Sequence, residues 1–81
     1  MSKQPWSQVE SDLLENVFYA HDSAAVSKAD DLAAEGMLDS LSIVAILETL
    51  IDAAGDEDAF ETAEASNFRN LKTIQALYEQ A

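Results

Sequence analysis

The stretch that decides the fold of this chain is Glu35-Gly36-Met37-Leu38-Asp39-Ser40-Leu41-Ser42-Ile43-Val44-Ala45-Ile46-Leu47-Glu48-Thr49-Leu50-Ile51. A polar segment ends at its glycine, an Asp-Ser pair follows, and a mostly apolar run begins at Leu41. Aspartate is a favoured residue for capping the start of a helix, and Gly55 is a typical stop signal after its end. The sequence therefore predicts a helix that begins at Asp39 or Ser40 and ends near Ala54.

This predicted helix is apolar around well over half of its circumference. At about 100° per residue, the apolar side chains cover most of its surface, and they are Leu41, Ile43, Val44, Ile46, Leu47, Leu50 and Ile51. The opposite stripe is expected to consist of Ser42, Ala45, Thr49 and Asp52. A helix this apolar is either central or touches a partner along its margin. In a chain of 81 residues we expect both.

A first helix is predicted over residues 7–20. Ser7 with Glu10 has the form of a capping box, in which two side chains satisfy the free N–H groups at a helix start. Apolar residues recur at spacings of three and four, which favours an amphipathic helix whose buried stripe is Val9, Leu13, Leu14, Val17 and Phe18.

The rest of the chain is predicted as a loop and two shorter helices. Residues 21–35 form a long loop with a turn within residues 28–34, and a loop of this length in a small domain indicates a functional role. Residues 56–66 are acidic and rich in alanine, and they are expected to hold a short helix. A last helix is predicted over residues 70–79, with Asn70 as its N-cap and an inward face of Leu71, Ile74, Leu77 and Tyr78.

The composition fits one small helical domain over residues 1–81. Hydrophobic residues make up 48% of the chain, while only two glycines and one proline are present, which disfavours a turn-rich β fold. The predicted class is all-α, a small antiparallel four-helix bundle with a long loop between helices 1 and 2 and a short helix 3.

The charge is strongly unbalanced, with 16 acidic residues, 4 basic residues and a net charge of −12. Nucleic acid is not an expected partner, because phosphate binding needs clustered Lys and Arg. Anionic membrane surfaces are disfavoured for the same reason, and a basic protein partner is the natural complement. The start of the chain lacks a signal-peptide pattern, and the longest apolar tract, residues 43–51, is too short to span a bilayer. We therefore expect a cytoplasmic protein with no membrane insertion.

Neither a catalytic group nor a metal site is predicted. The chain has no cysteine and one histidine, His21, which falls in the predicted loop. Ser40 and Asp39 lack the G-x-S-x-G elbow of a hydrolase, and the acidic run at residues 56–58 lacks the ligand spacing of a calcium-binding loop. We therefore expect a protein that is not an enzyme.

Ser40 is the residue best placed for chemistry. The first turn of a helix offers unpaired N–H groups and the positive end of the helix dipole, and both favour a phosphate ester formed there. On spacing alone, a plain helix cap is the more common explanation for an Asp-Ser pair.

The segment Gly36-Met37-Leu38-Asp39-Ser40-Leu41 resembles the attachment motif of the acyl carrier protein family. The resemblance spans most of the chain, including residues 67–77, which are similar to the last carrier helix. It implies that Ser40 bears a covalent 4′-phosphopantetheine arm taken from coenzyme A, whose thiol holds an acyl or aminoacyl group as a thioester. It also implies that Asp39 caps and orients the site and that Leu41 contacts partner enzymes.

Within that family, residues 35–40 are closer to freestanding aminoacyl and peptidyl carriers, such as the D-alanyl carrier protein, than to fatty-acid carriers. Fatty-acid carriers usually have acidic residues two and five positions after the serine, where this chain has Ser42 and Ala45. Partner contacts are therefore expected to be largely apolar, with Leu41 and Ile46 as the best candidates.

The resemblance implies a monomeric carrier that presents an aminoacyl or small acyl group to other enzymes. Its expected partners are a phosphopantetheinyl transferase, a ligase that activates an amino acid or acyl group, and a downstream enzyme that accepts the acyl group. Two alternatives stay open. One is a fatty-acid or polyketide acyl carrier that uses the same arm, and the other is an unmodified acidic helical interaction module.

Overall fold

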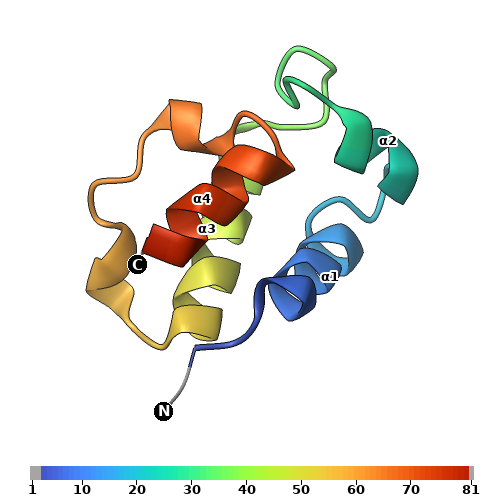
Figure 1. The fold of residues 1–81 in the computed structure, drawn as a ribbon. Coiled ribbons are helices and arrows are strands. Elements are labelled where there is room, and N and C mark those ends of the chain that lie inside the picture. Colours follow the sequence, from blue (N-terminus) through green and yellow to red (C-terminus); the bar gives the residue numbers. More distant parts are fainter. Residues whose placement is uncertain (1–2, 81) are drawn as a thin grey trace.

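The computed structural model describes residues 3–80, and over these residues the chain is all-helical, with no strand (Figure 1). Four α-helices and two 3-10 helices follow one another in the order α1 Trp6–Asn16, α2 Ser23–Lys28, α3 Ser40–Ala54, η1 Glu57–Phe60, η2 Ala65–Phe68 and α4 Leu71–Gln80. The Cα radius of gyration is 11.6 Å, close to the value of about 12 Å expected for a compact domain of this length. The all-α prediction is confirmed.

Helix α3 has the predicted limits. It begins at Ser40, with Asp39 as its N-cap, and ends at Ala54. Gly55 follows in the left-handed region at φ 71°, where its N–H donates to the carbonyl of Ile51. A residue without a Cβ adopts this φ without strain, which explains why the helix ends at a glycine.

Helix α1 is shorter than predicted, and the expected capping box is not formed. The helix begins at Trp6 after the extended Pro5, so Ser7 lies inside the first turn rather than at the cap. The Glu10 carboxylate instead accepts a hydrogen bond from the indole N–H of Trp6 at 3.1 Å. At the other end, the N–H groups of residues 17 and 18 both donate to the carbonyl of Leu13, and the chain leaves the helix there.

The long loop predicted over residues 21–35 contains a helix, so that part of the prediction is wrong. Helix α2 occupies Ser23–Lys28, and its Val26 is fully buried. A helix of six residues is too short to show a periodic stripe, and its stability comes from tertiary packing of that one side chain. The turn predicted within residues 28–34 overlaps the observed turn at residues 32–36.

The segment predicted as one short third helix forms two 3-10 turns instead. Phe60 ends η1 and Phe68 ends η2, and both rings are buried. The cap predicted for the last helix is confirmed, since the Asn70 side-chain oxygen accepts a hydrogen bond from the N–H of Thr73 at 3.0 Å. Leu77 is only half-buried.

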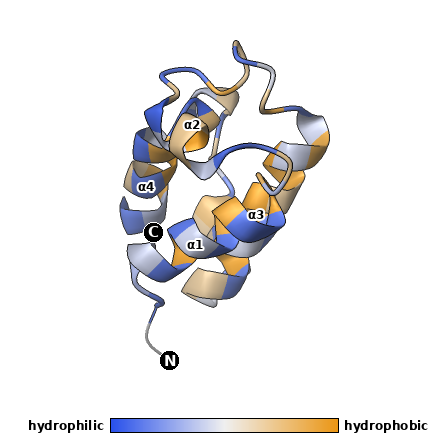
Figure 2. Cartoon of the chain, turned by 90° about the vertical axis from the view of Figure 1, so that its right-hand side faces the viewer, coloured by the Kyte–Doolittle hydropathy of each residue, from blue (hydrophilic) through white to orange (hydrophobic). Residues whose placement is uncertain are grey.

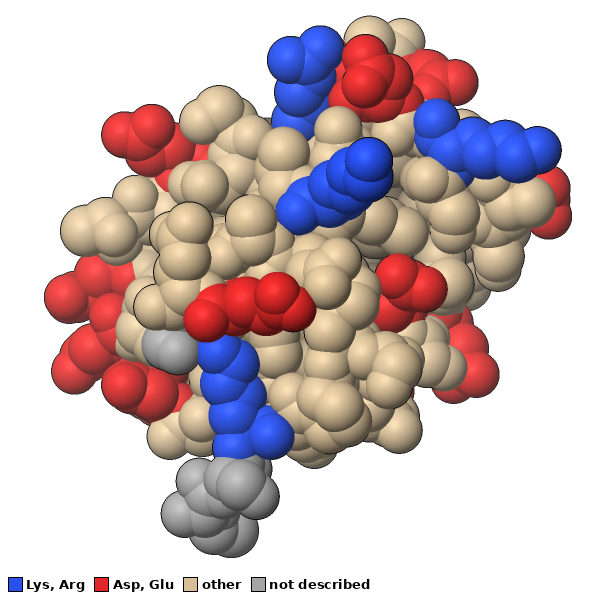
Figure 3. All heavy atoms as spheres, viewed as in Figure 1, with Lys and Arg blue, Asp and Glu red and all other residues tan. Residues whose placement is uncertain are grey.

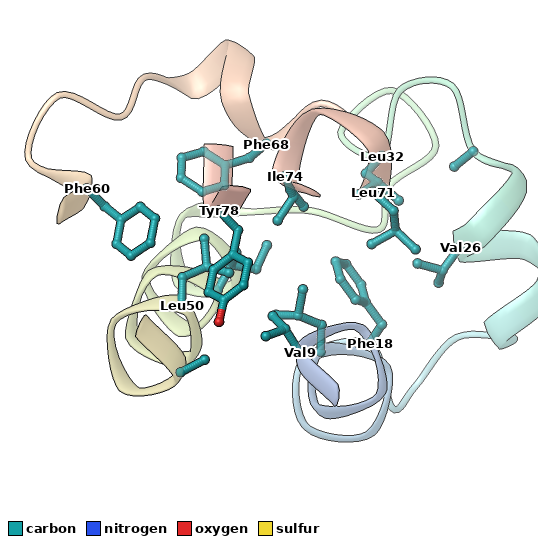
Figure 4. Packing of buried hydrophobic residues seen from close by; sticks show 14 residues of the cluster. Val9, Phe18, Val26, Leu32, Leu50, Phe60, Phe68, Leu71, Ile74 and Tyr78 are labelled. Atoms are coloured by element: carbon teal, nitrogen blue, oxygen red, sulfur yellow. The ribbon is translucent and has the colours of Figure 1, made fainter. Parts of the chain in front are cut away.

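One hydrophobic cluster joins all of these elements (Figure 4). Helix α1 contacts both α3 and α4, while η1 packs on α3 and η2 on α4. Tyr78 of α4 stacks on Phe60, and its hydroxyl donates to the carbonyl of Gln4. The N–H of Gln4 donates to the carbonyl of Ala53 at 3.0 Å, so the start of α1 is fastened to the ends of α3 and α4.

Candidate functional site

Ser40 is the first residue of α3 and is exposed. Asp39 before it has an extended backbone, at φ −137° and ψ −175°, and its side chain folds back over the first turn. The carboxylate accepts a hydrogen bond from the N–H of Ser42 at 2.8 Å. The structure therefore confirms Asp39 as the cap of this helix. Among the described residues, the Ser40 hydroxyl has no hydrogen-bond partner and is open to solvent.

The capping bond keeps a negative charge beside Ser40. The backbone N–H of Ser42 lowers the pKa of the Asp39 carboxyl below its usual value, and the Ser42 hydroxyl acts in the same direction. Each favours the ionised carboxylate because a hydrogen bond to the charged form stabilises it. Asp39 is therefore ionised at neutral pH and remains an acceptor for the helix start.

The first turn of α3 presents its backbone N–H groups at the start of the helix. The N–H of Ser42 is taken by Asp39, and that of Ile43 donates to the Asp39 carbonyl at 3.0 Å. The N–H of Leu41 also acts on the Asp39 carboxylate, whereas that of Ser40 has no partner within the helix, because the first residues of any helix lack one. These donors lie at the positive end of the helix dipole, so the residues at this point fit an anionic group attached to Ser40.

The segment before Ser40 is held by a closed turn. Gly36 has φ 74°, a left-handed conformation that favours glycine, and its N–H donates to the carbonyl of Ala33 at 3.1 Å. The N–H of Met37 then donates to the carbonyl of Leu32 at 2.9 Å. Because Leu32 is fully buried, it anchors in the core a turn whose end, Met37, lies two residues before Asp39.

An exposed face of α3 runs away from Ser40. It consists of Leu41, Val44, Glu48 and Asp52, and Leu41 is 80% exposed and Val44 53% exposed. Figure 2 shows the predominantly hydrophobic colouring of α3 beside α1. Two large apolar side chains in water next to an exposed serine mark a surface suited to contact with another molecule. Leu41, singled out from the sequence, lies on this face.

The expected orientation of α3 is wrong in part. Ser42, Ala45 and Thr49, predicted to face away from the core, are half-buried, and of that stripe only Asp52 is exposed. The reason is that α1 contacts this side of α3. A polar pocket of about 240 Å³ lies between the two helices, lined by Thr49, Asp52 and Ala53 with Gln4, Asp12 and Asn16.

Ile46 is not a partner contact, contrary to the sequence-based expectation. Its side chain has no exposed surface and lies in the core with Leu50. The same rotation of the helix that exposes Val44 turns Ile46 inward, since residues two positions apart on a helix face different directions.

Basic residues gather on one side of the molecule (Figure 3). Arg69 follows η2, Lys72 lies in the first turn of α4, and Lys28 lines a pocket of about 360 Å³ together with Lys72. Lys3 lies over the ring of Tyr78. Residues 29–68, which include α3, contain no Lys or Arg. The exposed face of α3 therefore carries only negative charges, those of Glu48 and Asp52.

The remaining titratable residues do not join the site. His21 is exposed in the turn after α1, and no hydrogen bond links it to Ser40 or Asp39. The Asp56 carboxylate accepts from the N–H of Asp58 at 3.0 Å and so caps η1. Within residues 3–80 there is no group of three or more His, Asp and Glu side chains placed to hold a metal ion. None of the helices described there is long and apolar enough to cross a bilayer.

Comparison with known proteins gives no relative. The chain matches no protein-family model, no curated protein and no solved structure.

Proposed function

We propose that this chain is a carrier protein that holds an aminoacyl or small acyl group on a 4′-phosphopantetheine arm attached to Ser40. The observation that carries the proposal is the exposed serine at the start of α3, beside an aspartate cap and an exposed apolar face. A helix start with unpaired N–H groups stabilises the negative charge of a phosphodiester.

Attachment of the arm requires a transferase and coenzyme A. The Ser40 oxygen forms a bond to the pantetheine-linked phosphorus, the pyrophosphate bond breaks, and the adenosine bisphosphate leaves. A base of the transferase takes the hydroxyl proton. The role of this chain is to present an unhindered hydroxyl on a fixed helix start. Once attached, the arm supplies the thiol that holds the cargo.

Partner recognition is proposed to use the exposed face of α3. Leu41 and Val44 supply the apolar contact, and the flanking Glu48 and Asp52 favour a partner surface that carries Lys or Arg. The partners on this proposal are the transferase, an activating ligase and an enzyme that accepts the acyl group. The carrier raises the effective concentration of cargo at each of them and catalyses no step itself.

The fold proposed for this role is the antiparallel four-helix bundle of carriers, with η1 and η2 in the place of a third helix. Support comes from the start of α1, where Gln4 bonds both to Ala53 at the end of α3 and to Tyr78 near the end of α4. Helix α1 then runs opposite to α3 and α4, and η1 and η2 make the connection between these two helices.

A labelling assay tests the proposal. The chain is incubated with a broad-specificity phosphopantetheinyl transferase and a fluorescent coenzyme A derivative, next to Ser40→Ala and Ser42→Ala variants. Labelling of the wild type and of Ser42→Ala, but not of Ser40→Ala, supports the carrier. Equal labelling of all three variants, or none in the folded wild type, contradicts it.

One second candidate has an observation in its favour. The exposed Leu41 and Val44 also suit an unmodified interaction module that uses α3 as its binding face. A chain that binds a partner through α3 and stays unmodified beside an active transferase is the outcome expected for that module.

For the proposed carrier, a fatty-acid or polyketide cargo remains the alternative. The pocket between α1 and α3 is lined mainly by polar side chains, which favours a small or polar cargo over an alkyl chain. A clear rise in melting temperature when the arm bears a long acyl chain, compared with an acetyl group, would favour the fatty-acid alternative. Equal melting temperatures fit the small cargo.

A further inference from the structure

The start of α4 is fastened to the segment that leads to Ser40, across about half the length of the chain (Figure 1). The carbonyl of Asp30 accepts two side-chain hydrogen bonds, from Asn70 Nδ2 at 2.9 Å and from Arg69 Nε at 3.3 Å. The N–H of Leu32 donates to the carbonyl of Arg69 at 2.7 Å. We call these three bonds the latch.

Apolar packing and ion pairs accompany the latch. Leu32 lies beside Leu71 in the core (Figure 4), so the contact has a buried side and an exposed side. On the exposed side the Arg69 guanidinium lies 3.6 Å from a carboxylate oxygen of Asp30 and 4.0 Å from one of Asp31. Exposed ion pairs stabilise a fold little. The hydrogen bonds to one carbonyl, which need donors in fixed places, are what define the position of the segment.

The latch continues toward Ser40 through the backbone. The N–H of Leu32 donates the latch bond to the Arg69 carbonyl, and the carbonyl of Leu32 accepts a hydrogen bond from the N–H of Met37. The Asp31 carboxylate accepts the N–H of Ala34 at 3.1 Å, which closes the same turn from the other side. From Met37 only two residues remain before Ser40, so the position of the serine depends on where Asp30 and Leu32 are held.

We propose that Arg69 and Asn70 are positioning residues for the modification of Ser40. The inference rests on the proposed function and adds two residues that lie nearly thirty positions after the serine. When the latch opens, fewer molecules hold residues 30–37 in the arrangement that a transferase binds. The apparent affinity falls in proportion to that fraction, while the chemical step at Ser40 is unchanged because the Asp39 cap does not depend on the latch.

Each of two variants removes one of the two side-chain bonds of the latch and leaves the backbone bond from Leu32 in place. Arg69→Lys keeps the charge but removes the Nε donor and the planar guanidinium. Asn70→Ser keeps a side-chain oxygen that caps α4 at Thr73 but is too short to reach the Asp30 carbonyl. Each variant is expected to raise the KM of the transferase for this chain about threefold to tenfold. This range corresponds to the loss of one hydrogen bond, whose net contribution is about RT ln 10 or less. The kcat is expected to change less than twofold.

Two controls separate the latch from charge and from stability. Lys72→Gln removes a positive charge from α4, two residues after Asn70, without removing a bond to residues 30–32. Phe60→Leu weakens the core at η1, away from the latch. Neither control is expected to raise the KM. An equal rise in Lys72→Gln shows a charge effect, an equal rise in Phe60→Leu shows a stability effect, and either result overturns the proposal.

Hydrogen exchange gives a second readout that needs no modification. Amides of residues 32–37 are expected to exchange faster in Arg69→Lys and Asn70→Ser than in the wild type, with amides in the middle of α3 unchanged. Unchanged exchange at residues 32–37 overturns the latch even if the transferase accepts the chain. If the two variants exchange faster but the transferase never modifies the wild type, the latch is retained and the proposed function is rejected.

Discussion

The carboxylate of Asp39 lies 2.8 Å from the backbone nitrogen of Ser42, and the two residues enclose Ser40 in the first turn of α3. The bond satisfies one N–H group of the helix start, and the N–H of Ser40 has no partner within the helix. It also places an ionised carboxylate next to the serine. The site is thus rigid in its backbone and open at its hydroxyl.

Loss of the cap is expected to weaken the start of α3. In Asp39→Ala the N–H of Ser42 loses its acceptor, so the urea midpoint of unfolding is expected to fall. Asp39→Asn keeps a side-chain oxygen at the cap, so its midpoint is expected to stay close to that of the wild type. Urea titrations followed by circular dichroism at neutral pH compare the three proteins. Equal midpoints for the alanine and asparagine variants would show that the cap contributes nothing.

The cap also predicts a dependence on pH. The pKa of Asp39 is lowered in the folded chain, so its contribution to stability is full above the pKa of the unfolded chain and is lost as the pH falls through the lower pKa of the folded chain. The stability of the wild type relative to Asp39→Asn should therefore stay constant above about pH 5 and decrease as the pH falls below about pH 4. A difference that stays constant down to pH 2 would contradict the role of the carboxylate.

The Leu41 side chain is expected to matter for partners and not for the fold. It is 80% exposed, so Leu41→Glu should change the free energy of unfolding by less than about 0.5 kcal/mol. The same variant should lower the kcat/KM of arm transfer, because an apolar contact is replaced by a charge. Thr62→Glu, which adds the same charge at an exposed position outside α3, is the matched control. Normal kinetics for Leu41→Glu would refute the contact.

The rotation of α3 can be tested by comparing two apolar positions. Ile46 is fully buried, and Ile46→Ala should cost about 2–5 kcal/mol through lost burial and the cavity left behind. Leu41→Ala should cost less than about 0.5 kcal/mol. Chemical denaturation measures both values. Similar losses at the two positions would mean that the helix presents a different face to the core.

Local signals explain why the position of Ser40 could be predicted. Asp39 is a strong capping residue, and Gly55 accepts the left-handed conformation that ends the helix. The residues that flank α3 therefore determine both of its limits. Asn70 marks the start of α4 in the same way. The start of α1 was predicted wrongly because more than one residue there can cap a helix. The cap was expected at Ser7, but the extended backbone of Pro5 places the start of the helix at Trp6.

Tertiary packing explains what could not be predicted. Helix α2 is held by the burial of Val26 and gives no periodic pattern of its own. Which side of α3 meets solvent depends on its packing against α1 near Thr49, and Val44 is left exposed. The latch between Asp30 and Asn70 joins residues 40 positions apart, and no spacing rule links them.

The most direct test of the carrier role is the intact mass of the folded protein after incubation with coenzyme A and a broad-specificity transferase. The proposal predicts one phosphopantetheine increment on the wild type, the same increment on Ser42→Ala, and none on Ser40→Ala, with all three giving the same helical circular dichroism spectrum. A folded wild type that gains no mass, or a Ser40→Ala variant that gains the increment, would contradict it.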